Sequence, residues 1–155
     1  MEDNPIPRPD PAVPANPLVL PDAPKNTESL ASAIVNAAWA KNAYDTRILN
    51  VSTLSGFTDV FVILTGRSDR HVGAISSAIE KDLKTRGHLP TGVEGRQAGT
   101  WVLLDYGNIV VHVFEKTTRE FYDLETLWTD AREITVEEPQ WVQDFARMEA
   151  EGDPY

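Results

Sequence analysis

The pattern of apolar and polar positions predicts alternating helices and strands in the middle of the chain. Apolar side chains recur at helical spacing after Thr27, so we expect a helix that Thr27 caps and that stops near Asn42. A second apolar stripe follows Ser68, which is a good N-cap for another helix. The run over 59–65 is unbroken in β-branched and aromatic residues, which is typical of a strand covered on both faces.

The second half of the pattern is dominated by two strong strand-like runs, 100–106 and 109–115. Gly107 and Asn108 separate them and readily supply the positive φ angles of a tight hairpin turn. Two shorter strands are expected, over 46–51 and, at a sheet edge, over 93–96. These elements predict an α/β fold with a mixed β-sheet packed against helices.

Two helices are expected toward the end of the chain. One is short and runs from Thr117 or Thr118 to Trp128. The other lies in the tail, where Pro139 would take the first helical position. Three of the residues that follow lie near one stripe of that tail helix: Trp141, Phe145 and Met148.

Proline and charge divide the chain into three parts. Eight of the eleven prolines fall within the first 26 residues, so we expect 1–27 to be an extended or disordered tail. Residues 28–131 form the predicted folded domain. Residues 132–155 form an acidic C-terminal tail, which contains the second of the two expected helices. The chain has 24 acidic and 14 basic residues. Most of the excess of acidic residues lies after residue 128, where there are eight acidic and two basic residues.

The overall composition narrows the class of protein. A net charge of −10 argues against sequence-specific nucleic-acid binding, which needs clustered Lys and Arg, and it suits a basic protein partner. No apolar run approaches the ~20 residues that span a bilayer, so no membrane partner is expected. The start of the chain does not read as a signal peptide, and there is no cysteine. We therefore expect a cytoplasmic protein.

One short segment is the nearest match to a catalytic or phosphate-binding motif. Phosphate-binding glycine loops are absent, and the closest feature is the turn over 66–71, which lies between a buried strand and a helix N-terminus. Ser68 and His71 lie three residues apart on that turn without an obvious third group. The histidines do not have metal-ligand spacing, and no D-x-D pair is present for magnesium. We expect no metal, no cofactor and no enzymatic activity.

The strongest remaining signal is a concentration of large aromatic residues between Trp101 and Trp128. A single mixed sheet buries one face under helices, so its other face needs a cover or a partner. Aromatic side chains are favoured anchors at protein–protein interfaces because each removes much apolar area from water. Strand alternation places His112 on the face opposite Val111 and Val113, where an interface role or a hydrogen-bonded role is expected.

Four blocks of this sequence resemble the ribosomal silencing factor family, whose members are also called Iojap-related proteins. The blocks, in order and with family spacing, cover 58–72 (T-D-V-F-V-I-L-T-G-R-S-D-R-H-V), 92–95 (G-V-E-G), 101–114 (W-V-L-L-D-Y-G-N-I-V-V-H-V-F) and 119–128 (R-E-F-Y-D-L-E-T-L-W). The resemblance spans residues 28–131 and leaves both tails outside it.

The resemblance implies a fold related to nucleotidyltransferases, often seen as a homodimer. It also implies binding to protein fourteen of the large ribosomal subunit, which blocks the joining of the small subunit and represses translation in nutrient limitation and stationary phase. Nucleotidyltransferase activity does not carry over, because the paired carboxylates that hold magnesium in those enzymes are not found in this sequence.

We therefore predict a partner-binding surface centred on the hairpin and the helix after it. Its contact residues are expected to be Trp101, Leu103, Asp105, Tyr106, His112, Phe121, Tyr122, Leu124 and Trp128. Two other interpretations remain open: a divergent nucleotidyltransferase-like enzyme that uses the 66–71 turn for phosphate, and a dimeric adaptor without ribosome contact.

Overall fold

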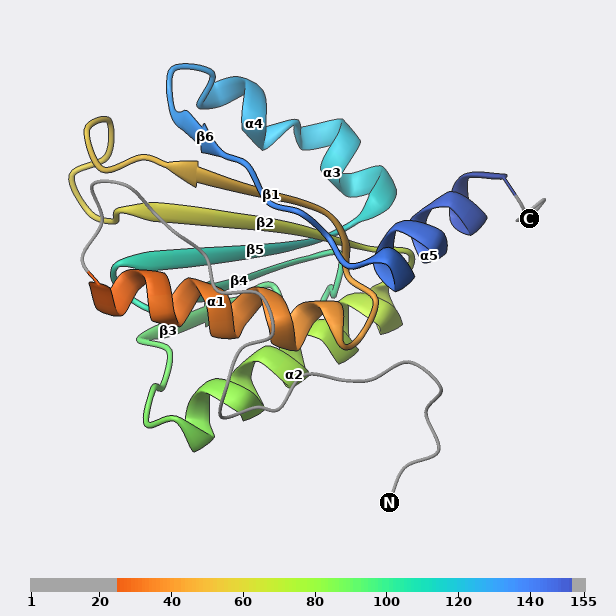
Figure 1. Cartoon of the computed structure of the whole chain (residues 1–155), viewed down its shortest axis with the longest axis horizontal. Helices are drawn as coiled ribbons and strands as arrows, with labels where there is room; N and C mark the ends of the chain where they lie inside the picture. Colours follow the sequence, from red (N-terminus) through yellow and green to blue (C-terminus); the bar gives the residue numbers. More distant parts are fainter. Residues whose placement is uncertain (1–24, 152–155) are drawn as a thin grey trace.

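The computed structural model describes residues 25–151 and contains one six-stranded sheet with helices on both faces (Figure 1). The elements in chain order are α1 (Lys25–Trp39), β1 (Tyr44–Asn50), β2 (Val60–Gly66), α2 (Asp69–Thr85), β3 (Gly92–Glu94), β4 (Trp101–Asp105), β5 (Ile109–Glu115), α3 (Lys116–Tyr122), α4 (Leu124–Leu127), β6 (Arg132–Ile134) and α5 (Gln140–Glu151). The α/β class with a mixed sheet is therefore confirmed.

The strand order across the sheet is β3-β4-β5-β2-β1-β6. The central pair, β2 and β5, is parallel, and every other neighbouring pair is antiparallel. Every residue of β2 is buried, as its unbroken apolar run predicts for a strand covered on both faces. The short strand predicted over 93–96 is β3, and it lies at an edge of the sheet as expected.

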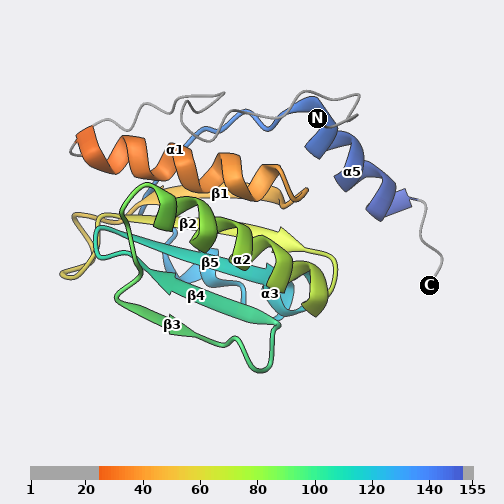
Figure 2. The same ribbon diagram turned by 90° about the horizontal axis from the view of Figure 1, so that it is seen from below.

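The first face of the sheet is covered by α1 and α2, which lie side by side over the strands (Figure 2). Their apolar stripes meet alternate residues of the strands, including Val62, Leu104 and Val111. Ser68 caps α2 as predicted, because its side chain accepts a hydrogen bond from the His71 backbone N–H at 3.1 Å. This face holds the larger of the two apolar clusters, so it is the main core.

The second face has a smaller cover. Its buried cluster includes Phe61, Val110 and Phe114 from the strands and Leu124 from α4. The covering elements, α3 and α4, are seven and four residues long. Helix α3 contacts β2 and β5 from the side opposite α2 (Figure 2). The second face is therefore the one on which apolar side chains reach the surface.

Three predicted helix starts are wrong. The first helix begins at Lys25, so Thr27 lies within it, and the Thr27 hydroxyl instead accepts a hydrogen bond from Asn108 Nδ2 at 2.6 Å. Glu115, not Thr117 or Thr118, caps α3 through its carboxylate. Pro139 precedes α5 rather than occupying its first position, and its carbonyl accepts from the backbone of Val142.

The hairpin turn and the predicted long helix also differ in detail. Gly107 has the expected positive φ of 88°, whereas Asn108 does not adopt one. The helix predicted to reach Trp128 is broken at Asp123, whose left-handed backbone (φ 47°, ψ 55°) ends α3 and starts α4. That single residue turns the chain and gives two short helices instead of one.

Residues after 131 contribute to the sheet and to the main core. The strand β6 pairs with β1, which the sequence pattern did not predict. The predicted tail helix is present as α5, and its Trp141 and Phe145 pack against the first-face core while Met148 is exposed. The boundary at residue 131 between the folded domain and the acidic tail remains a prediction. The proline-rich segment lies outside the described residues, apart from its last few.

None of the helices within residues 25–151 combines the length and the apolar character that crossing a bilayer requires.

Candidate functional site

The second face of the sheet carries a continuous cluster of aromatic rings. Trp101 on β4 lies with its ring centroid 4.7 Å from Phe114 and 5.1 Å from Tyr122. Phe61 on β2 makes edge-to-face contacts with His112 (4.9 Å) and with Trp128 (5.0 Å). Such edge-on and offset contacts are the favourable geometries for aromatic pairs. The cluster therefore links the hairpin to both short helices.

His112 lies at the centre of this cluster and holds Trp101 in place. The indole Nε1 of Trp101 donates to His112 Nδ1 at 3.2 Å. Because an indole N–H only donates, Nδ1 must accept, and the neutral ring therefore carries its proton on Nε2. Burial lowers the pKa of His112 to about 4, so the ring is neutral at pH 7. Its Nε2 is buried and has no hydrogen-bond partner among the described residues.

Several side chains beside this cluster are exposed to solvent. Phe121 and Leu127 are 78% and 77% exposed, and Tyr122 is 54% exposed. Trp101, Leu103 and Trp128 are half-buried. We call these six side chains the aromatic surface. They come from β4, α3, α4 and the residue that follows α4. An exposed apolar group of this size on one face is typical of a binding surface.

The structure places some predicted contact residues away from solvent. His112 and Leu124 are only 4% and 8% exposed, so they support the aromatic surface from beneath. Asp105 is half-buried, and its carboxylate accepts from the backbone N–H of Gly107 at 2.8 Å, which is a turn role. Tyr106 packs against the first-face core, on the opposite side of the sheet from Trp101.

The environment of Tyr106 shows that it belongs with α2. Burial, and to a lesser degree the negative charge of Glu80, raise the pKa of the Tyr106 hydroxyl to about 12. That hydroxyl is buried without a hydrogen-bond partner among the described residues. Leu127, in contrast, is highly exposed beside Trp128, although the sequence analysis did not select it. The sequence did offer a signal for Leu127, because residues three apart are neighbours on a helix and Leu127 follows the predicted contact residue Leu124 at that spacing.

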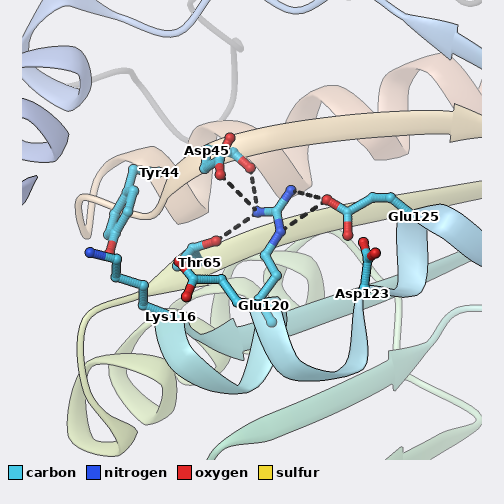
Figure 3. Close-up of a pocket in the computed structure, with 8 residues that line it drawn as sticks. Tyr44, Asp45, Thr65, Lys116, Glu120, Asp123 and Glu125 are labelled. Atoms are coloured by element: carbon cyan, nitrogen blue, oxygen red, sulfur yellow. Dashed lines mark hydrogen bonds and ion pairs between the residues drawn. The ribbon is translucent and has the colours of Figure 1, made fainter.

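A polar cavity of about 210 Å³ lies under the α3–α4 corner (Figure 3). Its lining includes Arg119, which is only 6% exposed. Arg119 donates to Glu125 Oε2 through Nε (3.1 Å) and Nη2 (2.7 Å). It also donates through Nη1 to the Asp45 carbonyl (2.5 Å) and to Thr65 Oγ1 (2.6 Å). Sequence reasoning missed this residue, because nothing in the pattern distinguishes a buried arginine from an exposed one.

The 66–71 turn, which was the candidate phosphate site, is engaged by α5. Arg67 forms an ion pair with Glu149 at 3.0 Å, and its guanidinium lies 5.5 Å from the Phe145 ring centroid. His71 Nδ1 accepts from the Arg67 backbone N–H, which leaves Nε2 to donate to the Lys41 carbonyl at 2.7 Å. Ser68 uses its hydroxyl as the helix cap. Arg67, Ser68 and His71 thus already have partners within the fold, whereas the side chain of Arg70 is exposed.

Within residues 25–151, no three His, Asp or Glu side chains are grouped in a way that would hold a metal ion.

Comparison with known proteins agrees with the resemblance. A family model described as "Ribosomal silencing factor during starvation" matches residues 24–154. The chain is 37% identical over 112 residues to the "Ribosomal silencing factor RsfS" of Halalkalibacterium halodurans, covering 72% of this chain and 96% of that protein. It is 36% identical over 99 residues to the mouse "Mitochondrial assembly of ribosomal large subunit protein 1", covering 62% of this chain and 43% of the mouse protein.

A solved structure is also similar. The crystal structure of protein CV0518 from Chromobacterium violaceum matches with a TM-score of 0.64 at 30% identity, covering 72% of this chain and 93% of that chain.

Proposed function

Because the chain belongs to the ribosomal silencing factor family, we propose that it acts in the cytoplasm by binding the large ribosomal subunit through its aromatic surface. The observation that carries this proposal is the exposure of Phe121, Tyr122 and Leu127 beside the half-buried Trp101. Large apolar side chains gathered on one face lose contact with water when a partner covers them, and aromatic anchors account for much of the binding energy at such interfaces.

The partner on the large subunit is proposed to be ribosomal protein fourteen, as the family resemblance implies. The electrostatics support a basic partner. The net charge of the chain is −10, and the α3–α4 corner presents exposed Glu120 and Asp123 beside the aromatic rings. Opposite charge steers the encounter of two proteins and speeds their association, whereas burial of the apolar side chains supplies the affinity.

The proposed mechanism is steric. A protein bound to the subunit-joining face of the large subunit occupies space that the small subunit needs, so it represses translation without any chemical step. This requires a preformed and rigid contact surface. The Trp101–His112 hydrogen bond and the packing of Trp128 on Phe61 supply that rigidity, because they fix ring orientations before the partner arrives.

Co-sedimentation with purified large subunits tests the proposal. Leu127→Ser removes an exposed apolar side chain from the aromatic surface and is expected to weaken binding. Leu89→Ser is the matched control, because Leu89 is 68% exposed and follows α2 at a distance from the aromatic cluster in sequence and fold. Equal binding by the wild type and Leu127→Ser, or equal loss in both variants, would show that binding does not use this surface.

The enzyme alternative is tested separately. Arg67, one of the two arginines of the 66–71 turn, is engaged by Glu149 and Phe145 and is therefore less available to phosphate. We expect no turnover when the protein is incubated with nucleoside triphosphates and Mg²⁺. Turnover without large-subunit binding would favour the nucleotidyltransferase-like interpretation. Concentration-dependent self-association without large-subunit binding would favour the dimeric adaptor.

A further inference from the structure

We propose that Arg119 is a positioning residue for the aromatic surface: its buried guanidinium joins the α3–α4 corner to β1 and β2 and thereby sets where Phe121 and Tyr122 stand. The inference rests on the proposed function of that surface, because the position of these rings affects function only if a partner binds to them.

The first observation is that α3 buries a charged side chain, and that its aromatic contact with the sheet is made by the exposed Tyr122, whose ring centroid lies 5.1 Å from that of Trp101. Arg119 is the buried residue of that helix, and Phe121 and Tyr122 at its end are exposed. In α4 the buried residue is Leu124. A surface helix is ordinarily anchored by an apolar stripe of several side chains. In this corner a charged side chain takes the place of that stripe, so the location of α3 depends on the polar contacts of Arg119.

Those contacts come from three different elements. Glu125 on α4 accepts hydrogen bonds from Nε and Nη2 of Arg119. The Asp45 carbonyl of β1 and the Thr65 hydroxyl of β2 accept hydrogen bonds from Nη1. A guanidinium has its donors in a rigid planar fork, so it defines the direction of each partner as well as the distance. One side chain on α3 therefore fixes the helix relative to two strands and to the helix that follows.

The backbone around Arg119 is shaped to supply these acceptors. Asp45 has a φ of 53°, at the point where the β1–β2 register shifts between Tyr44 and Arg47. Asp123, at the α3–α4 junction, has a φ of 47°. Left-handed backbone at residues other than glycine costs free energy and persists where the surroundings hold it in place. Both residues flank the Arg119 cavity (Figure 3), which is consistent with a corner maintained by specific contacts.

The contacts of Arg119 are linked through Glu125 to β1 and to β6, which is an edge strand of the sheet. Glu125 Oε2 lies 3.5 Å from Arg47 Nη1 on β1, and Arg47 donates through Nε to Glu133 of β6 at 2.8 Å. Glu125 is therefore shared between two arginines. Interacting charges that share a partner respond together when one member is removed. Loss of Arg119 is expected to release α4 as well as α3.

The position of this ion pair argues for a role beyond stability. Removing an arginine and a carboxylate from water costs free energy that can exceed the attraction between the two charges. Apolar side chains of similar size often stabilise a fold equally well. What the pair offers in exchange is a defined geometry. Here the geometry concerns the exposed rings of Phe121 and Tyr122, which contact each other and, through Tyr122, the ring of Trp101.

Two variants of Arg119 separate positioning from charge. Arg119→Met keeps an unbranched chain of similar length but removes every donor, and Arg119→Lys keeps the charge but loses the fork. Hydrogen exchange of the backbone amides over 116–128 reports the order of the corner, and co-sedimentation reports binding to large subunits. The matched control is Arg86→Met, which removes a half-buried pair with Asp82 (2.8 Å) at the end of α2.

We expect amide exchange over 116–128 to accelerate by about tenfold or more in Arg119→Met, with β2 and β5 still protected, and binding to fall by about tenfold or more. Arg119→Lys should fail to restore either property. Arg86→Met should match the wild type in both. If Arg119→Met does not fold, Glu125→Gln provides the same comparison, because it removes the charge of the main acceptor and leaves the arginine in place.

The inference is overturned if exchange over 116–128 is unchanged in the folded variant, if binding persists despite faster exchange, or if Arg119→Lys restores both. If the wild type itself does not bind large subunits, the proposed function fails, and the exchange measurement alone decides for or against the role of Arg119.

Discussion

Lowering the pH from 8 to 5 should destabilise the protein through one buried side chain, His112. In the unfolded chain this imidazole takes up a proton near its usual pKa of about 6.5. In the fold it stays neutral until about pH 4, because burial lowers its pKa. Between these values only the unfolded state gains the proton, so the free energy of unfolding falls as the pH falls. The loss begins near pH 6.5 and is complete near pH 4.

The size of the effect follows from the pKa difference. A shift of one pKa unit corresponds to about 1.4 kcal/mol, so a change from 6.5 to about 4 gives roughly 3 kcal/mol once the pH is below both values. At pH 5 most of the difference is already present, about 2 kcal/mol. The structural reason is that a protonated His112 can no longer accept from Trp101 Nε1 and would leave a charge buried among aromatic rings.

The assay is urea unfolding at pH 8, 6.5, 6 and 5, followed by tryptophan fluorescence and circular dichroism. His112→Gln is the comparison, since glutamine retains an acceptor and does not titrate. It is expected to be less stable at pH 8 and to lose about 2 kcal/mol less than the wild type on going to pH 5. If the two proteins show the same pH dependence, His112 is not held neutral by the fold, and our account of how Trp101 is oriented is wrong.

Three further substitutions have clear expected outcomes. Trp101→Ala should weaken large-subunit binding by more than about 1 kcal/mol, or about fivefold, measured by co-sedimentation; unchanged binding would move the interface elsewhere. Gly95→Ala should lower the stability by about 1–3 kcal/mol in thermal unfolding, because Gly95 has a φ of 87° and an added Cβ would lie 1.9 Å from the Trp101 carbonyl oxygen. Tyr44→Phe should leave the stability within about 1 kcal/mol of the wild type or raise it, since it removes a buried hydroxyl without a partner among the described residues; a larger loss would indicate a hidden hydrogen bond.

The parts of the fold that follow local rules could be predicted from the sequence. The buried run of β2, the Ser68 cap and the positive φ of Gly107 each depend on a few neighbouring residues. Alternation along β5 likewise placed His112 on the second face, where the structure has it. The same alternation places Tyr106 and Trp101 on opposite faces of the sheet. The prediction that both belong to one contact surface did not take this into account.

The features that escaped prediction depend on partners distant in sequence. β6 is three residues long and exists because Ile134 pairs with Ile48 of β1, which leaves no periodic pattern to detect. The break at Asp123 is sustained by the contacts of the α3–α4 corner, in which Arg119 reaches Asp45 from 74 residues away. Long-range polar contacts of this kind have no local signal, since the same residue types usually lie on solvated faces.

The most direct test of the central claim is whether the protein prevents subunit joining by occupying the large subunit. Purified large subunits are first incubated with the wild type, Leu127→Ser or Leu89→Ser, small subunits are then added, and the products are separated by sedimentation. We expect the wild type and Leu89→Ser to leave the subunits separate, and Leu127→Ser to permit joining. Full joining in the presence of wild-type protein at saturating concentration would contradict the account.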